Sequence, residues 1–184
     1  LLVGATQRAC GAGLPTRRAS PEATELAARA VSLVASSLSV LLLYGLLSRL
    51  TGPHTALWAT AAFSLLPVRA ELSVQVLSES TYLLFVLAGA CLWLSSLDAD
   101  GRLWRALAAG ATMGAAYLAR PEGLLAGGVL ALGMVWLGRG SGRRALWTAL
   151  AYTAAMLLCV VPYVLWLHAR TGQWALSGKT IDFF

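Results

Sequence analysis

The side chains best suited to chemistry in this sequence are a few charged residues set between apolar runs. Arg120 and Glu122 flank Pro121 in the segment LARPEGLL, and Arg69 and Glu79 bound the segment RAELSVQVLSE. Arginine holds phosphate and carboxylate groups through charge-assisted hydrogen bonds, whereas carboxylates accept hydrogen bonds from hydroxyl groups. These four residues together suit the recognition of an anionic headgroup and a polar sugar.

A purely structural role for the same residues is also open. Arg120 and Glu122 can pair with each other and anchor a corner between two helices. Glu79 precedes a long apolar run, so its charge can instead stabilise the positive end of a helix dipole. The binding role is favoured because acidic and basic groups from separate helix ends converge on one face.

Composition places the chain with membrane proteins. Hydrophobic residues make up 58% of its 184 residues and charged residues 12%, whereas a soluble domain carries about 25% charged residues. The net charge of +6 comes from arginines scattered between apolar segments, which is typical of membrane topology and not of a nucleic-acid partner. The three cysteines form neither a disulfide framework nor a metal-ligand spacing. No cofactor is evident, and dependence on a divalent metal is left open.

The elements that must position these side chains are helices. Uncharged runs occupy residues 30–48, 55–68, 80–97, 106–119, 123–138 and 145–167. They lack the two-residue alternation of barrel strands, and only helices or closed barrels satisfy the backbone in lipid. We therefore predict an all-α, polytopic transmembrane bundle with about six membrane helices, some of them short of the roughly 20 residues that a full span needs.

The connections between these runs differ in charge. Alternate connections carry six arginines, namely Arg49, Arg102, Arg105, Arg139, Arg143 and Arg144. The intervening ones carry only Arg69 and Arg120, each with an acidic neighbour. The positive-inside rule predicts that the arginine-rich connections are cytoplasmic and that both chain ends, including the polar segment His168–Trp174, are outside.

The sequence also predicts the local structure around Arg120. A helix that starts at Arg105 on the inner side brings Arg120 about 22 Å along its axis, just short of the outer edge of the hydrocarbon. Pro121 disfavours helix at the preceding residue, so the chain turns there, and Glu122 starts the next helix. Small residues four apart, as in Gly110–Gly114 and Gly123–Gly127, predict close packing between neighbouring helices.

Several segments resemble glycosyltransferase family 39, which contains the dolichyl-phosphate-mannose protein mannosyltransferases and the bacterial aminoarabinose-lipid A transferases. The similar segments run from Glu25 to Arg49, from Leu77 to Tyr82, over Arg120-Pro-Glu-Gly123, and from Pro162 to Lys179. The resemblance covers about residues 20–180, and the order and spacing of the segments are its most specific feature. It implies a membrane fold of the C-superfamily glycosyltransferase type.

This resemblance also implies a function. A sugar is transferred from a polyprenyl-phosphate donor to a protein, lipid or glycan acceptor, with inversion, on the extracytoplasmic face of the cytoplasmic (inner) membrane. Arg120 matches a basic position associated with the donor phosphate, and we expect Glu79, Glu122 and Arg69 to line the sugar cavity. The catalytic aspartate of the family lies in a loop that we expect upstream of Leu1, so the chain is read as an internal fragment.

We accordingly expect three segments: the end of an extracytoplasmic loop at 1–25, a transmembrane region at 26–168 and the start of the next loop at 169–184. Two rival classes remain open at this point. The main rival is a fragment of a transporter or flippase, which is also polytopic with intramembrane charge. The second is a non-catalytic membrane scaffold, in which the outer charges are isolated ion pairs.

Overall fold

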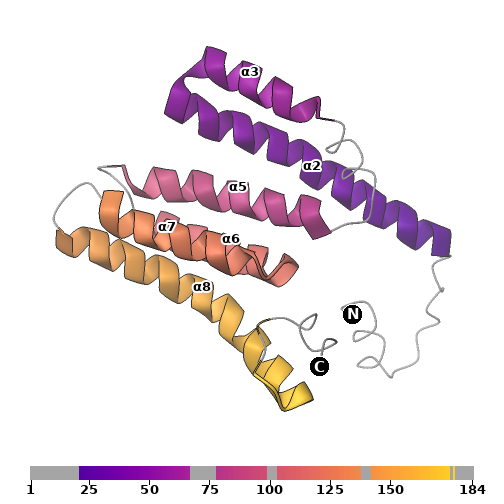
Figure 1. Ribbon diagram of the computed structural model, residues 1–184, viewed down its shortest axis with the longest axis vertical. Coiled ribbons are helices and arrows are strands. Elements are labelled where there is room, and N and C mark those ends of the chain that lie inside the picture. Colours follow the sequence, from indigo (N-terminus) through magenta and orange to yellow (C-terminus); the bar gives the residue numbers. More distant parts are fainter. Residues whose placement is uncertain (1–20, 67–77, 99–102, 138–141, 175, 177–184) are drawn as a thin grey trace.

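The regular elements of the structure are α-helices. The computed structural model describes residues 21–66, 78–98, 103–137, 142–174 and 176, with side chains from Glu25 onward. Within these residues it contains six helices: α2 (Pro21–Thr51), α3 (Pro53–Ser64), α5 (Ser78–Ser96), α6 (Leu103–Ala119), α7 (Gly123–Leu137) and α8 (Gly142–Thr171) (Figure 1). Each predicted apolar run overlaps one of them, so the prediction of an all-α fold with six helices is confirmed.

The helices differ in whether they are long enough to cross a membrane. Among those described, three are long and apolar enough, at Glu25–Thr51, Ser78–Ser96 and Gly142–Thr171. The 12 residues of α3 rise about 18 Å, against roughly 30 Å of hydrocarbon. α2, α5 and α8 are thus candidate membrane spans by length and composition, and the prediction that α3, α6 and α7 are also membrane helices stays a prediction.

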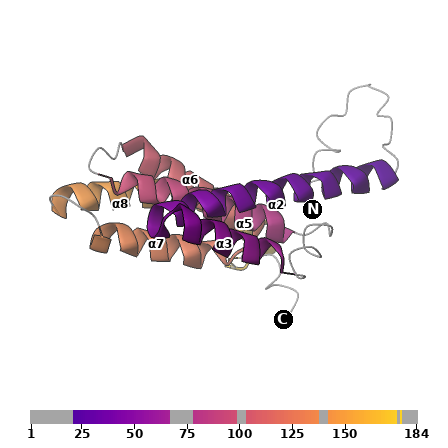
Figure 2. The same ribbon diagram turned by 90° about the horizontal axis from the view of Figure 1, so that it is seen from above.

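The helices lie side by side, with α6 between α5 and α8 (Figure 1). α7 packs on α6 and α8, whereas α2 packs against α3 and α5. α2 extends beyond its neighbours at its N-terminal end, as the view from above also shows (Figure 2). Gly52, with φ of 92°, makes the tight turn from α2 to α3, a conformation that suits glycine because it has no Cβ.

Close packing of α6 against α8 depends on two glycines. A Cβ on Gly110 would overlap the backbone carbonyl oxygen of Tyr152, and a Cβ on Gly114 would lie 2.6 Å from Cβ of Cys159. Gly127 likewise admits the sulfur of Met156 where a side chain would stand. The predicted packing role of these small residues is confirmed, because the neighbouring helices occupy the space that a larger residue would fill.

Two side-chain hydrogen bonds, one buried and one partly buried, hold α7 in place. The hydroxyl of Tyr152, on α8, donates to the carbonyl oxygen of Gly127 at 3.0 Å. The indole nitrogen of Trp93, on α5, donates to the carbonyl oxygen of Leu130 at 2.7 Å. Each bond satisfies a polar group that would otherwise be costly to bury, and together they fix α7 between α5 and α8.

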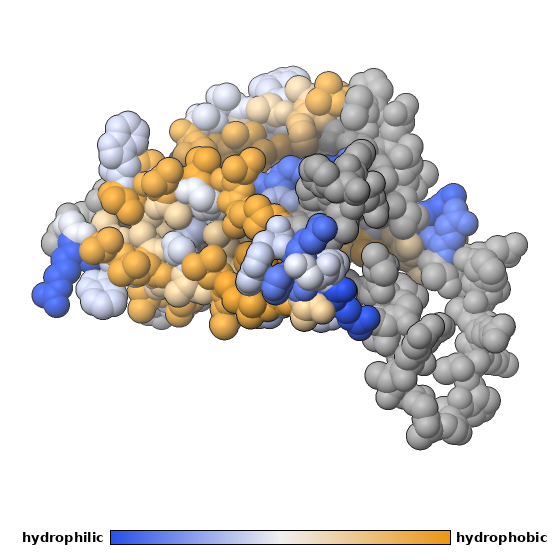
Figure 3. Space-filling view, turned by 60° about the horizontal axis from the view of Figure 1, so that its bottom comes forward, coloured by the Kyte–Doolittle hydropathy of each residue, from blue (hydrophilic) through white to orange (hydrophobic). Residues whose placement is uncertain are grey.

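The outer surface of the bundle is mainly hydrophobic. Figure 3 shows hydrophobic residues over the middle of the face that includes α8, with hydrophilic residues toward its two ends. Large apolar side chains such as Val129, Trp136 and Leu158 are mostly exposed on it. A contiguous apolar surface of this kind suits contact with lipid and not with water.

The charged residues gather at the two ends of the bundle. At one end, which we call the Arg105 end, Arg105 on α6 donates to the carbonyl oxygen of Ser95 at 3.0 Å, and Arg49 on α2 lies 3.5 Å from the Ser95 hydroxyl. Cations suit this position because it is the C-terminal, negative end of α5. The opposite end, which we call the Arg120 end, holds the starts of α2, α5 and α7 and the end of α8.

Candidate functional site

The site begins at the corner between α6 and α7. α6 ends at Ala119, and the Arg120 amide still donates to the carbonyl oxygen of Ala116 at 2.9 Å. The chain then turns at Pro121, and the carbonyl of Glu122 accepts the amide hydrogen of Ala126 at 3.3 Å as α7 starts. The predicted turn after Arg120 and the predicted helix start at Glu122 are confirmed, with α7 beginning at Gly123.

Packing of α5 against α6 brings a second charged residue to this corner. Glu79 is in the first turn of α5, and its Oε1 lies 3.1 Å from Nη1 of Arg120. The side chain of Arg120 is 30% exposed and that of Glu79 is 32% exposed. The pair is thus partly shielded from solvent, yet one face of each charge remains accessible.

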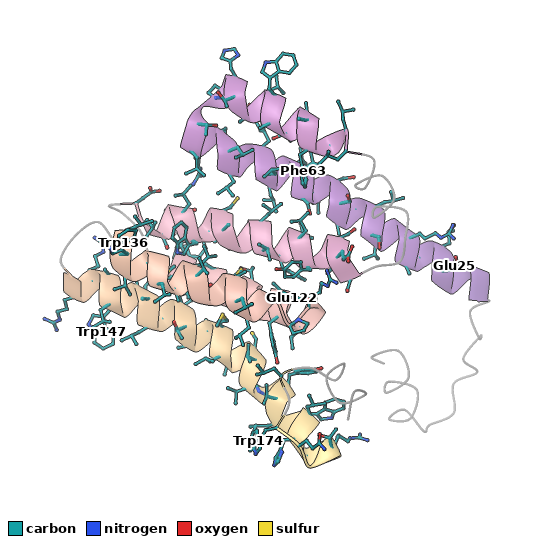
Figure 4. The ribbon with its side chains drawn as sticks, viewed as in Figure 1. Glu25, Phe63, Glu122, Trp136, Trp147 and Trp174 are labelled. Carbon is teal, nitrogen blue, oxygen red and sulfur yellow. The ribbon has the colours of Figure 1, made fainter. Side chains whose placement is uncertain are left out.

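Glu122 completes the cluster at a longer distance. Its Oε2 lies 3.9 Å from Nε of Arg120, which is too long for a hydrogen bond, and its side chain is 58% exposed. Figure 4 shows Glu122 at the end of the α6–α7 pair, near the start of α5. With two carboxylates beside one guanidinium, the three side chains carry a net charge of about −1.

The arrangement leaves binding capacity on the arginine. A guanidinium has five N–H donors, and the contacts to Glu79 and Glu122 involve Nη1 and Nε. Other N–H donors of the guanidinium therefore remain for an added anion.

Three of the four predicted site residues are therefore brought together, since Glu79, Arg120 and Glu122 share one corner. Arg69 lies outside the described residues. Within the part of the chain that the structure describes, no three His, Cys, Asp or Glu side chains are grouped so that they hold a metal ion.

An aromatic cluster near this corner was not anticipated from the sequence. Tyr117 lies one turn before Arg120 and meets Tyr163 of α8 edge to face, with ring centroids 6.0 Å apart. Tyr163 stacks on Trp166 at 6.3 Å, and the guanidinium of Arg170 lies 5.5 Å from the Trp166 ring. A signal for this cluster was present in the sequence. Residues three or four apart share one face of a helix, and this is the spacing of Tyr163, Trp166 and Arg170.

The segment after α8 folds back onto the bundle at the same end. The His168 and Trp174 rings are stacked at 3.9 Å, and the Tyr117 hydroxyl donates to the carbonyl oxygen of Leu176. Gly172, with φ of 70°, ends α8, and its amide donates to the carbonyl oxygen of His168 at 2.8 Å. The predicted polar segment His168–Trp174 thus lies at the Arg120 end.

Three of the described helices are long and apolar enough to cross a membrane, as expected of a membrane protein. The family model described as dolichyl-phosphate-mannose-protein mannosyltransferase matches residues 21–166, and the chain belongs to this family. No curated protein and no solved structure matches it. The predicted resemblance is confirmed, and the family is one of membrane glycosyltransferases that use a lipid-linked sugar donor, which sets aside the transporter alternative.

Proposed function

We propose that this chain forms part of a membrane glycosyltransferase in which Arg120 holds the phosphate of a polyprenyl-phosphate-linked sugar. Transfer to a protein, lipid or glycan acceptor takes place on the extracytoplasmic face of the cytoplasmic membrane, within a fold of the C-superfamily type. The observation that carries the proposal is the corner itself, where a partly exposed guanidinium at a helix end lies 3.1 Å from Glu79.

The depth of Arg120 supports a role with a lipid phosphate. Arg105 and Arg120 lie at opposite ends of α6, about 22 Å apart along its axis at 1.5 Å per residue. If the Arg105 end is at one membrane surface, Arg120 lies several Å inside the other edge of a hydrocarbon layer of roughly 30 Å. A charge at that depth is stable only in a protein-lined or wet cleft, and a lipid phosphate can enter such a cleft from the side.

In the proposed reaction the acceptor loses a proton to a carboxylate base and attacks the anomeric carbon of the donor sugar. The bond between that carbon and the phosphate oxygen breaks with inversion, and polyprenyl phosphate leaves with the bonding electron pair. Negative charge therefore grows on the phosphate as the bond breaks. A guanidinium already in place at that oxygen stabilises the charge without reorganisation of solvent.

The carboxylates at the corner have a different role in this proposal. Glu79, freed from Arg120 when the phosphate binds, accepts hydrogen bonds from sugar hydroxyls, and Glu122 keeps the guanidinium oriented. Arg69, which the sequence places near Glu79, is proposed to line the same cavity. The ion pair is about one-third exposed. It is suited to the replacement of Glu79 by phosphate, because its two side chains are neither fully hydrated nor fully buried.

The test is lipid binding by the full-length protein in detergent. We expect Arg120→Ala to weaken the binding of polyprenyl phosphate about 10- to 100-fold, because a charge-assisted hydrogen bond contributes about 1.5–3 kcal/mol. Arg120→Lys should recover part of the affinity, since lysine restores the positive charge but not the paired N–H donors of the guanidinium.

The matched control is Arg29→Ala, which removes the same charge from an exposed pair with Glu25 on α2. Its binding should equal that of the parent protein. Normal lipid binding by Arg120→Ala, or equal losses in the two alanine variants, would show that the corner does not hold the phosphate.

A further inference from the structure

The Arg105 end of the bundle carries positive charge that the proposed reaction does not use. Among the residues that the structure describes, this end holds one carboxylate, Asp98, and four arginines, namely Arg49, Arg105, Arg143 and Arg144. At the Arg120 end, by contrast, the guanidinium of Arg120 lies beside two carboxylates. An excess of one sign of charge attracts a partner of the opposite sign, so the Arg105 end suits an anion.

Two of these arginines meet at the last turn of α5. Arg105, on α6, donates through Nη1 to the carbonyl oxygen of Ser95 at 3.0 Å. Arg49, on α2, brings its Nη1 to 3.5 Å from the Ser95 hydroxyl oxygen. That hydroxyl donates its own hydrogen to the carbonyl oxygen of Cys91, so toward Arg49 it acts as an acceptor. Ser95 therefore brings two guanidiniums from different helices close together.

Capping of α5 accounts for Arg105 but not for Arg49. The Ser95 carbonyl lies at the end of α5, where carbonyl groups lack a helical partner, and Arg105 satisfies it. The carbonyl of Leu94 accepts the amide hydrogen of Leu97 at 3.2 Å. Neither arginine forms an ion pair with a carboxylate among the described residues. Arg49 thus adds a second, unbalanced positive charge, and an anion between the two guanidiniums removes the cost of their repulsion.

The two arginines have donors left for a phosphate group. A guanidinium has five N–H donors, and the contacts with Ser95 involve one nitrogen of each. Arg49 is exposed and Arg105 is half-buried, with its guanidinium 5.9 Å from the ring of Trp104. Guanidiniums bind phosphate through paired, charge-assisted hydrogen bonds, so the two arginines can hold one phosphate together.

Exposed tryptophans at the same end indicate that this site lies at the membrane surface. Trp104 on α6, Trp136 on α7 and Trp147 on α8 are each more than half exposed, and Figure 4 shows Trp136 and Trp147 at this end. Tryptophan is enriched at the level of the lipid headgroups in membrane proteins. A phosphate at Arg49 and Arg105 is therefore level with a phospholipid headgroup, next to the apolar surface of the bundle.

We propose that Arg49 and Arg105 hold the phosphate of an anionic phospholipid in the membrane leaflet at the Arg105 end. This site is separate from the Arg120 corner and goes beyond the proposed reaction. The cytoplasmic leaflet, where the arginine-rich connections are predicted to lie, carries anionic lipid, and basic sites between membrane helices on that side bind acidic headgroups. A phosphate that bridges the two arginines also joins α2 to α6, both of which pack on α5.

The experiment measures lipid binding by the delipidated full-length protein in a neutral detergent. Native mass spectrometry gives the dissociation constants of phosphatidylglycerol and of phosphatidylcholine with the same acyl chains, which has no net charge. We expect Arg49→Gln to weaken the binding of phosphatidylglycerol about ten-fold and that of phosphatidylcholine little, because a charge-assisted hydrogen bond is lost. Arg105→Gln should have the same effect, and Arg49→Lys should recover part of the affinity.

The matched control is Arg143→Gln, which removes the same charge from an exposed position at the start of α8. Its affinity for phosphatidylglycerol should stay within about two-fold of that of the parent protein. Glycerol phosphate, which has the charge but no acyl chains, should bind at least about 100-fold more weakly than phosphatidylglycerol. Arg49→Gln keeps the bond between Arg105 and Ser95, so the test stands even if Arg105→Gln unfolds.

Three results would overturn the proposal. Equal losses in the three glutamine variants mean that only the general charge of this end attracts the lipid. Equal affinity of the parent protein for the two lipids means that it does not recognise an anionic headgroup. Glycerol phosphate that binds as tightly as phosphatidylglycerol means that the ligand is a soluble anion. The donor site is tested separately, because Arg120→Ala should leave phosphatidylglycerol binding unchanged and Arg49→Gln should leave polyprenyl phosphate binding unchanged.

Discussion

The ion pair between Glu79 and Arg120 allows a quantitative test of whether the corner is built for structure or for exchange with an anion. The perturbation is a double-mutant cycle with Glu79→Gln, Arg120→Gln and the combined variant. Glutamine keeps the approximate size of each side chain and removes its charge. The cycle isolates the coupling free energy between the two side chains from other effects of each substitution.

The expected coupling free energy follows from the distance between the two charges and from their exposure. Two unit charges 3.1 Å apart attract by about 5 kcal/mol at an effective dielectric constant of 20, which is an upper limit. Desolvation and side-chain ordering oppose this, and both side chains are about one-third exposed. We therefore expect a coupling of about 1–2 kcal/mol, between the 0–1 kcal/mol of surface pairs and the 3–5 kcal/mol lost when a buried pair is broken.

The assay is thermal unfolding of the detergent-solubilised protein, followed by tryptophan fluorescence at low and high salt. In a chain of this size, 1 kcal/mol corresponds to a shift of about 2–4 °C. The coupling should shrink at high salt, because the exposed side of the pair is screened. It should also shrink when polyprenyl phosphate is added, since the phosphate replaces Glu79 at the guanidinium.

Two outcomes contradict an exchange of Glu79 for phosphate at Arg120. A coupling of 3 kcal/mol or more, insensitive to salt and lipid, is the signature of a buried structural pair, and the corner then serves only to join the helices. A coupling near zero means that the two side chains do not interact in the protein. Glu79→Gln should in addition impair sugar transfer while the protein stays folded, and normal transfer would leave Glu79 with the capping role alone.

The remaining predictions concern packing and topology. Gly110→Ala should cost about 1–3 kcal/mol or more in unfolding free energy, because its Cβ would overlap the Tyr152 carbonyl oxygen. Gly45→Ala is the control and should not destabilise the protein, because no atom lies near its Cβ. If Gly110→Ala and Gly45→Ala have the same melting temperature, the close packing of α6 on α8 is rejected. In intact cells, a membrane-impermeant thiol reagent should label a cysteine substituted at Gln173 but not one at Ser141. The reverse labelling pattern rejects the proposed orientation.

Much of the helical framework was predictable because it depends on local properties of the chain. Long apolar runs interrupted by charge define where helices lie in a membrane protein. Pro121 marks the corner, because proline disfavours helix at the residue before it. The helix ends were less predictable, as α2 begins at Pro21, well before its apolar run at residue 30.

The contacts of the site depend on how each helix is rotated about its axis, which the sequence does not specify locally. Glu79 and Arg120 are 41 residues apart, and they meet only because α5 and α6 pack antiparallel in one particular rotation. Long-range contacts also link α5 to α7, where the Trp93 indole donates to the carbonyl oxygen of Leu130. The position of Arg69 was predicted from sequence alone and stays a prediction.

The attachment of α2 and α3 to the bundle has a mechanical consequence. These two helices pack on each other and, through α2, on α5, which is the helix that carries Glu79. α5 packs on α6 as extensively as α6 packs on α8, so α2 and α3 connect to the ion pair through α5. A displacement of α2 therefore reaches Glu79 before it reaches Arg120.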